Sequence, residues 1–222
     1  EHRLRPSWWT YLRTRLRVRG HQITKHVQHD VLGGALYRLQ KYISSLLAEI
    51  SVRPGHRPGI PDATRAEIIA RVQPGDVFVV RKEFAVTNYF LPGYWPHAAL
   101  IVGDPSSTSH PVLEAMKDGV RLRPMASPLA SDSVVVLRPR LTMPAIATAL
   151  ERALVHEGKP YDFDFDFTRA DRLVCTEVVY RAYDGVGEMH FELEQHVGRP
   201  ALGAEALIRS SLSGRNFLPH LV

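Results

Sequence analysis

The spacing of apolar residues divides the chain into a helical first part, a run of strands and a helical last part. Residues 29–50 repeat apolar side chains at steps of three and four, which predicts one amphipathic helix. Residues 51–61 are rich in Pro and Gly and indicate a linker. The next stretch, 62–71, predicts a short helix with Asp62 as its N-cap. We therefore expect an extension over 1–61 and a folded domain over 62–222.

Short apolar runs separated by turn residues begin after Gln73, which is typical of strands. The predicted strands cover 77–80, 97–102, 112–116, 120–123 and 134–137. Helices are predicted over 144–157, with Ile146, Leu150 and Leu154 on one face, over 174–184, and over about 202–212. Helices, then a meander of strands, then helices predict an α+β fold with an antiparallel sheet.

The composition is that of a globular protein, with 45% hydrophobic and 23% charged residues. A single cysteine, Cys175, excludes an intrachain disulfide and a zinc site built on several cysteines. The sequence contains no run of 18 apolar residues, so no membrane-spanning helix is predicted. The chain begins with Glu1 rather than Met, so we expect that its N-terminus has been processed or trimmed. The sequence then leaves the cellular compartment open. A cell-envelope or membrane-peripheral location is favoured over a cytoplasmic one.

The positive charge is concentrated in residues 1–26, which hold seven Lys/Arg and one acid. The rest of the chain holds 21 Lys/Arg against 22 Asp/Glu, so a nucleic-acid partner is not expected. Basic residues interleaved with Trp8, Trp9 and Tyr11 suit an anionic membrane surface. The alternative is a solvated arm without a partner. For the helix at 29–50 there are two interpretations: it covers the folded domain, or it pairs with a second copy in a homodimer.

Cys175 is the strongest chemical feature, because it lies where a helix is predicted to begin. Unpaired N–H groups and the helix dipole at such a position favour thiolate over thiol. The alternative is an inert buried cysteine among apolar neighbours. His97, at the start of a strand, is a candidate base, and Glu114 on the next strand is placed to orient the imidazole ring. Nucleophile, base and orienting acid form the general triad arrangement, here in the order His, Glu, Cys.

Several short motifs accompany these residues in a fixed order. A Gly-Asp pair opens the strand region, a His starts an apolar strand that ends in Gly, and a Glu-Ala strand precedes a Gly-Val turn. A Gly-x-x-Tyr-Asp segment and a Cys-Thr-Glu-Val-Val segment follow. They are Gly75-Asp76, His97 to Gly103, Glu114-Ala115, Gly119-Val120, Gly158 to Asp162, and Cys175 to Val179.

From about residue 73 to 183, the chain resembles the permuted papain-like amidases of the NlpC/P60 superfamily, in the YiiX/YebB-like branch. The resemblance implies a papain-like fold with its halves swapped in order, in which a helix packs against a small antiparallel barrel or sheet. It also implies that Cys175 is the nucleophile, His97 the base and Glu114 the orienting residue. Tyr161 takes an oxyanion or substrate-positioning role by the same resemblance. The alternative for Tyr161 is an aromatic packing residue.

The alternating run of acids and aromatics from Asp162 to Phe167 resembles part of a calcium-binding loop. The Gly and the distal Glu of an EF-hand are missing, so no metal and no cofactor are expected. The alternation also fits a strand with Phe163, Phe165 and Phe167 facing inward.

Three functions are compatible with these residues. The first is a cysteine hydrolase or peptidase that cleaves an amide in a small peptide or a peptidoglycan-derived substrate. The second, by resemblance to lecithin–retinol acyltransferase, is hydrolysis or transfer of a lipid acyl ester, which the aromatic loop 84–95 would suit. The third is a non-catalytic binding module, which the complete His97, Glu114 and Cys175 set disfavours.

Overall fold

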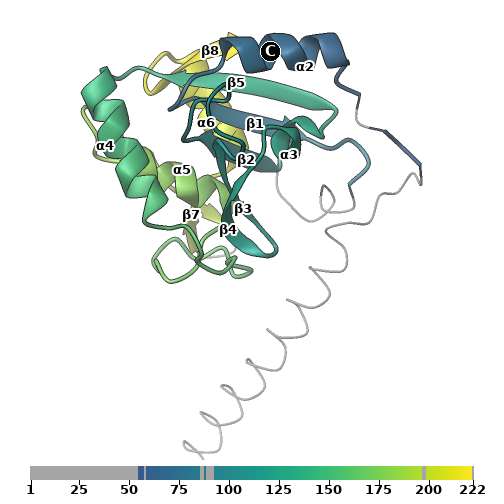
Figure 1. The fold of residues 1–222 in the computed structure, drawn as a ribbon. Helices are drawn as coiled ribbons and strands as arrows, with labels where there is room; N and C mark the ends of the chain where they lie inside the picture. The colour runs from purple at the N-terminus through teal and green to yellow at the C-terminus, as the bar shows by residue number, and fades with distance from the viewer. Residues whose placement is uncertain (1–54, 58, 86–87, 89–92, 197–198, 222) are drawn as a thin grey trace, which may run out of the picture. The chain divides into compact units, whose positions relative to one another are not determined.

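The computed structural model describes residues 55–221, apart from 58, 86–87, 89–92 and 197–198 (Figure 1). All of these residues belong to one compact unit, Leu46–Val222. The arm at 1–26, predicted to bind an anionic membrane, and the helix predicted at 29–50, with its possible homodimer, lie outside the described residues. They stay predictions, as does the domain boundary at 61/62.

Apart from the strand that the alternation at 162–167 suggested, the helices and strands predicted from residue 62 onward are present, within a few residues of their expected bounds. The predicted ones are α2 Asp62–Arg71, β1 Val77–Arg81, β2 His97–Ile101, β3 Val112–Met116, β4 Gly119–Arg123, β5 Ser133–Pro139, α4 Met143–Leu154, α5 Cys175–Tyr183 and α6 Ala204–Leu212. Four short elements were not predicted: α3 Ala126–Leu129, β6 Glu194–His196, β7 Arg199–Ala201 and β8 Phe217–Leu221.

Six strands form one antiparallel sheet in the order β4-β3-β2-β1-β5-β8. The α+β class with an antiparallel sheet is therefore confirmed. β2 lies inside this sheet, between β1 and β3, so its backbone is fixed from both sides. Strand β8, near the end of the chain, pairs with β5 and occupies one edge.

The sheet is covered on both faces, which explains why its central strands are apolar at successive positions. Val77, Val79, Ala98 and Leu100 pack into a core shared with α4, α5 and α6. The alternate residues Phe78, Val80, Ala99 and Ile101 pack into a second core with Ile68 of α2 and Leu129 of α3. Figure 1 shows α4 and α5 side by side on one side of the sheet.

Two details of the predicted helices were wrong. Asp62 is the first helical residue of α2 rather than its cap, because Pro61 holds the cap position, and its carboxylate pairs with Arg65 at 3.2 Å. On α4, Ile146 is buried as expected, but Leu150 is half-buried and Leu154 is exposed. The buried face of α4 consists of Ile146, Ala149 and Ala153. Alanine side chains are small, so α4 can approach α5 closely. A pattern built on the large apolar residues alone does not predict this buried face.

The turn before β1 is fixed by a buried ion pair. Asp76 has no exposed surface, and its Oδ2 accepts the N–H of Gln73 at 2.9 Å. Arg138 of β5 donates to both carboxylate oxygens of Asp76, at 2.9 and 2.7 Å. This bidentate pair joins the start of β1 to its neighbour β5.

Replacing Asp76 with Ala should lower the free energy of unfolding by about 3 kcal/mol, because Arg138 and the Gln73 N–H lose a buried partner. Urea unfolding followed by tryptophan fluorescence measures the change. Asp62→Ala, which removes the exposed pair with Arg65, is the control and should cost less than about 1 kcal/mol. Equal losses in the two variants would contradict the structural role of Asp76.

Candidate active site

The candidate nucleophile lies at the first residue of α5. Val174 before it is extended, with φ −93° and ψ 168°, so the chain turns into the helix at Cys175. The Cys175 sulfur accepts hydrogen bonds from the backbone N–H groups of Ala98 and Thr176. The start of α5 and the start of β2 therefore meet at this sulfur.

His97 connects Cys175 to Glu114. Its Nε2 lies 2.7 Å from Glu114 Oε1, and its ring also forms a side-chain hydrogen bond with Cys175. Because Nε2 is engaged by Glu114, Nδ1 is the ring nitrogen available to the sulfur. The structure thus brings together Cys175, His97 and Glu114, the three residues predicted from the sequence, and they contact one another in that order.

The three residues come from both layers of the fold. Leu113 and Ala115 belong to the core under α5, so the alternation of β3 directs Glu114 to the opposite face, toward α3. Cys175 belongs to the core on the α5 face. His97 is the first residue of β2 and contacts both partners around the end of the sheet.

Mutual charge attraction favours the ionised forms of Cys175 and His97. Burial alone would lower the pKa of His97, but the thiolate charge and hydrogen bonds to Cys175 and Glu114 raise it to about 10. Burial raises the pKa of the Cys175 thiol, yet the His97 charge and the hydrogen bonds to its sulfur bring it below its ordinary value. The pair stabilises the fold from that lowered pKa up to about pH 10. Its contribution is lost as acid protonates the sulfur and as base deprotonates the ring.

Glu114 is ionised although it is almost fully buried. Burial raises the pKa of its carboxyl, but the bond to His97, the bond to Ser127 and the charge of Arg123 hold it below the usual value. Ser127 of α3 donates to Glu114 Oε2 at 2.5 Å, and Arg123 Nε lies 3.5 Å from the same oxygen.

Sequence reasoning missed Ser127 and Arg123. The register of β3 and β4 places Arg121 opposite Glu114, and Arg123 two residues further on the same face. The pairing of β3 with β4 was therefore a signal that Arg123 lies near Glu114. Ser127 lies on a four-residue helix that no sequence pattern indicated.

Tyr161 is held beside the start of α5 by backbone bridges. The Asp162 N–H donates to Leu173 O at 3.1 Å, and the Leu173 N–H donates to Pro160 O at 3.0 Å. Burial and the charges of Cys175 and Asp162 raise the pKa of Tyr161 well above its ordinary value, so its hydroxyl stays protonated. Such a hydroxyl can donate a hydrogen bond to a developing negative charge.

The turn between β3 and β4 sets the position of the segment that carries Tyr161. Val120 N–H donates to Lys159 O at 2.9 Å. Gly119 has φ +100°, and a Cβ at this position would lie 2.5 Å from Lys159 O. Only glycine therefore permits this approach without a shift of the backbone.

The acidic and aromatic run after Tyr161 is a loop and not the strand that its alternation suggested. Asp162 is fully buried and accepts the backbone N–H groups of Asp164 and Asp166, at 3.0 and 2.6 Å, which bends the chain. Phe163 and Phe167 are buried, whereas Phe165 is half-buried. Within the described residues, no group of three or more His, Cys, Asp or Glu is arranged to hold a metal ion.

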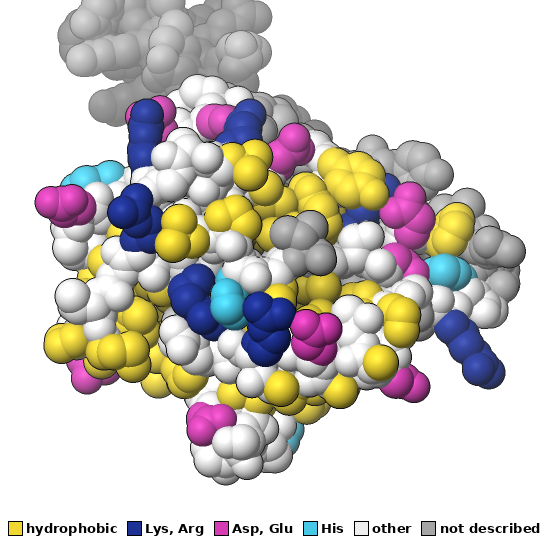
Figure 2. Space-filling view, turned by 90° about the horizontal axis from the view of Figure 1, so that it is seen from above, with side chains coloured by type: hydrophobic (Ala, Val, Ile, Leu, Met, Phe, Trp, Pro, Cys, Tyr) yellow, Lys and Arg dark blue, Asp and Glu magenta, His cyan; other side chains and the backbone are white. Residues whose placement is uncertain are grey.

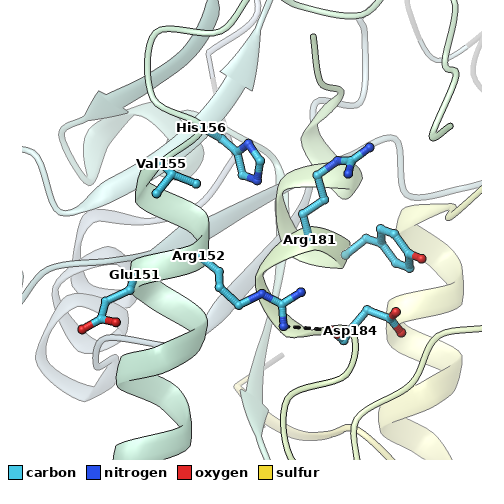
Figure 3. Close-up of a pocket in the computed structure, with 7 residues that line it drawn as sticks. Glu151, Arg152, Val155, His156, Arg181 and Asp184 are labelled. Atoms are coloured by element: carbon cyan, nitrogen blue, oxygen red, sulfur yellow. Dashed lines mark hydrogen bonds between the residues drawn. The ribbon is translucent and has the colours of Figure 1, made fainter. Parts of the chain in front are cut away.

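One pocket lies away from these residues, between α4 and α5 (Figure 3). It has a volume of about 560 Å³ and carries both signs of charge, from Arg152 and Arg181 and from Glu151 and Asp184. A second pocket of about 210 Å³ is lined by α6 and residues near His190. Neither is lined by Cys175, so hydrogen bonding and charge, not pocket size, identify the site.

The surface shown in Figure 2 is not dominated by one type of side chain. On the face shown in Figure 2, basic, acidic and hydrophobic side chains are interspersed. Among the described helices, none is both long and apolar enough to cross a membrane.

A permuted papain-like arrangement is the class that this fold and site define, with the histidine-bearing sheet before the cysteine-bearing helix. Residues 71–202 match the family described as permuted papain-like amidase enzyme, YaeF/YiiX, C92 family. The match spans more than half of the chain, and the chain belongs to this family. The resemblance found in the sequence is thereby confirmed, at a finer level than the NlpC/P60 superfamily.

One solved structure is also similar, the metalloprotein yiiX from Escherichia coli O157:H7. It is 23% identical, the alignment covers 64% of this chain and 81% of that chain, and the TM-score is 0.47. No curated protein matches this chain.

Iodoacetamide should label Cys175 readily near pH 6, where an ordinary thiol with a pKa of about 8.5 reacts slowly. His97→Ala should move the labelling profile to higher pH, because the sulfur loses its charge partner. Intact mass reports the site directly, since Cys175 is the only cysteine. His110→Ala, at an exposed histidine, is the control and should leave the profile unchanged. Labelling of the native protein only above about pH 8 would mark Cys175 as a plain structural thiol.

Proposed function

We propose that the protein is a cysteine hydrolase that cleaves an amide bond in a peptide or cell-wall-peptide substrate. Cys175 acts as nucleophile, His97 as acid and base, and Glu114 as the residue that orients His97. The observation that carries the proposal is the connected Cys175–His97–Glu114 chain with its charge-stabilised thiolate. Membership of an amidase family supports the same class of reaction. A binding module would need no ionised thiol, which favours catalysis.

In the first half of the reaction, the Cys175 thiolate attacks the carbonyl carbon and the C=O electron pair moves to the oxygen. The N–H of Cys175 has no helical acceptor at this position, so it can donate to that oxygen together with the Tyr161 hydroxyl. The His97 imidazolium then gives its proton to the amide nitrogen as the C–N bond breaks. An amine leaves and a thioester remains on Cys175.

In the second half, neutral His97 takes a proton from water as the water oxygen attacks the thioester carbon. The C–S bond breaks, a carboxylic acid leaves, and the thiolate–imidazolium pair is restored. Glu114 keeps one ring nitrogen occupied through both halves, so the ring presents the other nitrogen to the reacting atoms.

Acid quenching during turnover of peptide p-nitroanilides should trap an acyl group on Cys175, seen as an increase in intact mass. Cys175→Ser should stay folded and form no adduct, because this site is not built to deprotonate a hydroxyl. Glu114→Gln should lower kcat by roughly 10²-fold, the scale of a general acid–base contribution, while shifting the labelling profile less than His97→Ala does. An adduct on another residue, or full activity in Cys175→Ser, would refute the mechanism.

A second function, hydrolysis or transfer of a lipid acyl ester, is favoured by the aromatic side chains around the site. Trp95 lies two residues before His97 and is half-buried, as are Tyr161 and Phe165. The rings of Tyr161 and Phe165 are 6.4 Å apart. Phe165 has φ 53°, a conformation that costs a non-glycine residue about 1–3 kcal/mol and is often found at functional sites. These rings suit an apolar acyl group.

p-Nitrophenyl esters of increasing chain length distinguish the two functions. If the acyl group is lipid-like, kcat/KM should rise from acetyl to octanoyl, and Phe165→Ala should reduce the octanoyl rate while sparing the acetyl rate. Each buried methylene contributes about 0.8 kcal/mol of apolar transfer free energy, so the rise should be steep. A flat series, unchanged by Phe165→Ala, would leave amide hydrolysis as the function.

A further inference from the structure

We infer that Glu177 and Arg181 form a positioning pair that holds the start of the Cys175 helix and the loop carrying Tyr161 in one fixed arrangement. The inference rests on the proposed function, because it assigns the pair to the same site. Neither residue touches the reacting atoms; both act through the backbone around them.

The pair begins with a fully buried carboxyl group two residues after Cys175, in the first turn of α5. Glu177 has no exposed surface, and its Oε2 accepts the N–H of Val174, the residue before Cys175, at 3.4 Å. This bond, from the N-cap backbone N–H to the N3 side chain, is the half of a capping box that a valine N-cap permits, and it fixes the angle at which the chain enters α5. The same angle aims the Thr176 N–H at the Cys175 sulfur.

Arg181 extends the connection from the helix to the loop. Its Nε donates to Glu177 Oε1 at 2.7 Å, and its Nη2 donates to the backbone carbonyls of Phe167 at 3.1 Å and Arg169. Both carbonyls lie between Tyr161 and Cys175 in the chain. Arg181 also lines the α4–α5 pocket, and in Figure 3 its guanidinium group points away from Arg152 and Asp184.

Stability alone does not account for this pair. A buried ion pair is often no more stable than apolar residues of similar volume. Burial raises the pKa of Glu177 to about 7, against the lowering effects of Arg181 and the Val174 N–H, and the nearby Asp162 charge raises it further. The pKa lies above its ordinary value, so the ionised form costs stability as the pH rises through about 7. Glu177 accepts from the Val174 N–H and Arg181 donates to the Phe167 and Arg169 carbonyls, so the pair joins two backbone segments of the site at this cost, which points to a positioning role.

An isosteric substitution separates positioning from stability. At pH 8, Glu177→Gln should change Tm little, because the amide has the shape of the carboxyl and its oxygen still accepts a hydrogen bond from Arg181. The same variant should lower the rate of iodoacetamide labelling of Cys175 at pH 6 by about tenfold, equivalent to one pKa unit of thiolate stabilisation, because an amide NH2 group in place of one carboxyl oxygen cannot accept the Val174 N–H. A purely structural residue would move Tm and leave the labelling rate of the folded protein unchanged.

Two further variants complete the experiment on the full chain. Arg181→Lys keeps the charge beside Glu177 but cannot reach both carbonyls and the carboxylate, so its labelling rate should fall as well. Glu67→Gln is the matched control, since Glu67 and Arg71 form an exposed pair with the same four-residue spacing on α2, at 3.0 Å. It should change neither Tm nor labelling.

The outcomes distinguish this inference from the proposed function. If the native protein labels rapidly at pH 6 and both Glu177→Gln and Arg181→Lys stay within twofold of its rate, the positioning role is refuted and the hydrolase proposal stands. If Glu177→Gln fails to fold, Arg181→Lys decides alone. If the native protein itself labels only above about pH 8, both proposals fail together.

Discussion

At the start of β2, the positive charge of His97 lies between two buried negative groups, the Cys175 sulfur and the Glu114 carboxylate. The domain is arranged so that other groups compensate the negative charge that His97 leaves. His97 lies between the Cys175 sulfur and the Glu114 carboxylate and neutralises only one of them. The remaining negative charge needs further donors, since an uncompensated buried charge is very costly. Ser127 and Arg123 supply them at Glu114, and backbone N–H groups supply them at the sulfur.

These donors come from different layers, so the sheet has to be covered on both faces. α3 brings Ser127 to one face, and α5 brings Cys175 to the other. β2 is the element common to both, because its first side chain contacts each layer and the N–H of its second residue, Ala98, reaches the sulfur. A two-layer fold with one bare sheet face would not provide this set of partners.

Sequence reasoning located His97, Glu114 and Cys175 because each lies at a place that local pattern marks: a strand start, a strand carboxylate and a helix start. It also identified the sheet, since short apolar runs between turn residues predict strands directly. Sequence reasoning failed where contacts between residues distant in the chain determine the local structure. A buried Asp162 turned an alternating run into a loop, and alanines rather than leucines formed the buried face of α4. Ser127, the Glu177–Arg181 pair and β8 depend on partners distant in the chain, which periodicity cannot indicate.

The long separation in sequence between His97 and Cys175 has a kinetic consequence for the thiol. Cys175 receives its stabilising contacts from His97 and Ala98, which lie much earlier in the chain, so they form only after a non-local β2–α5 contact has closed. Non-local contacts of this kind tend to form slowly during folding. Until they form, the Cys175 sulfur lacks the charge of His97 and the Ala98 N–H, both of which lower its pKa in the folded domain. Alkylation at low pH thus also reports the moment when the domain completes its fold.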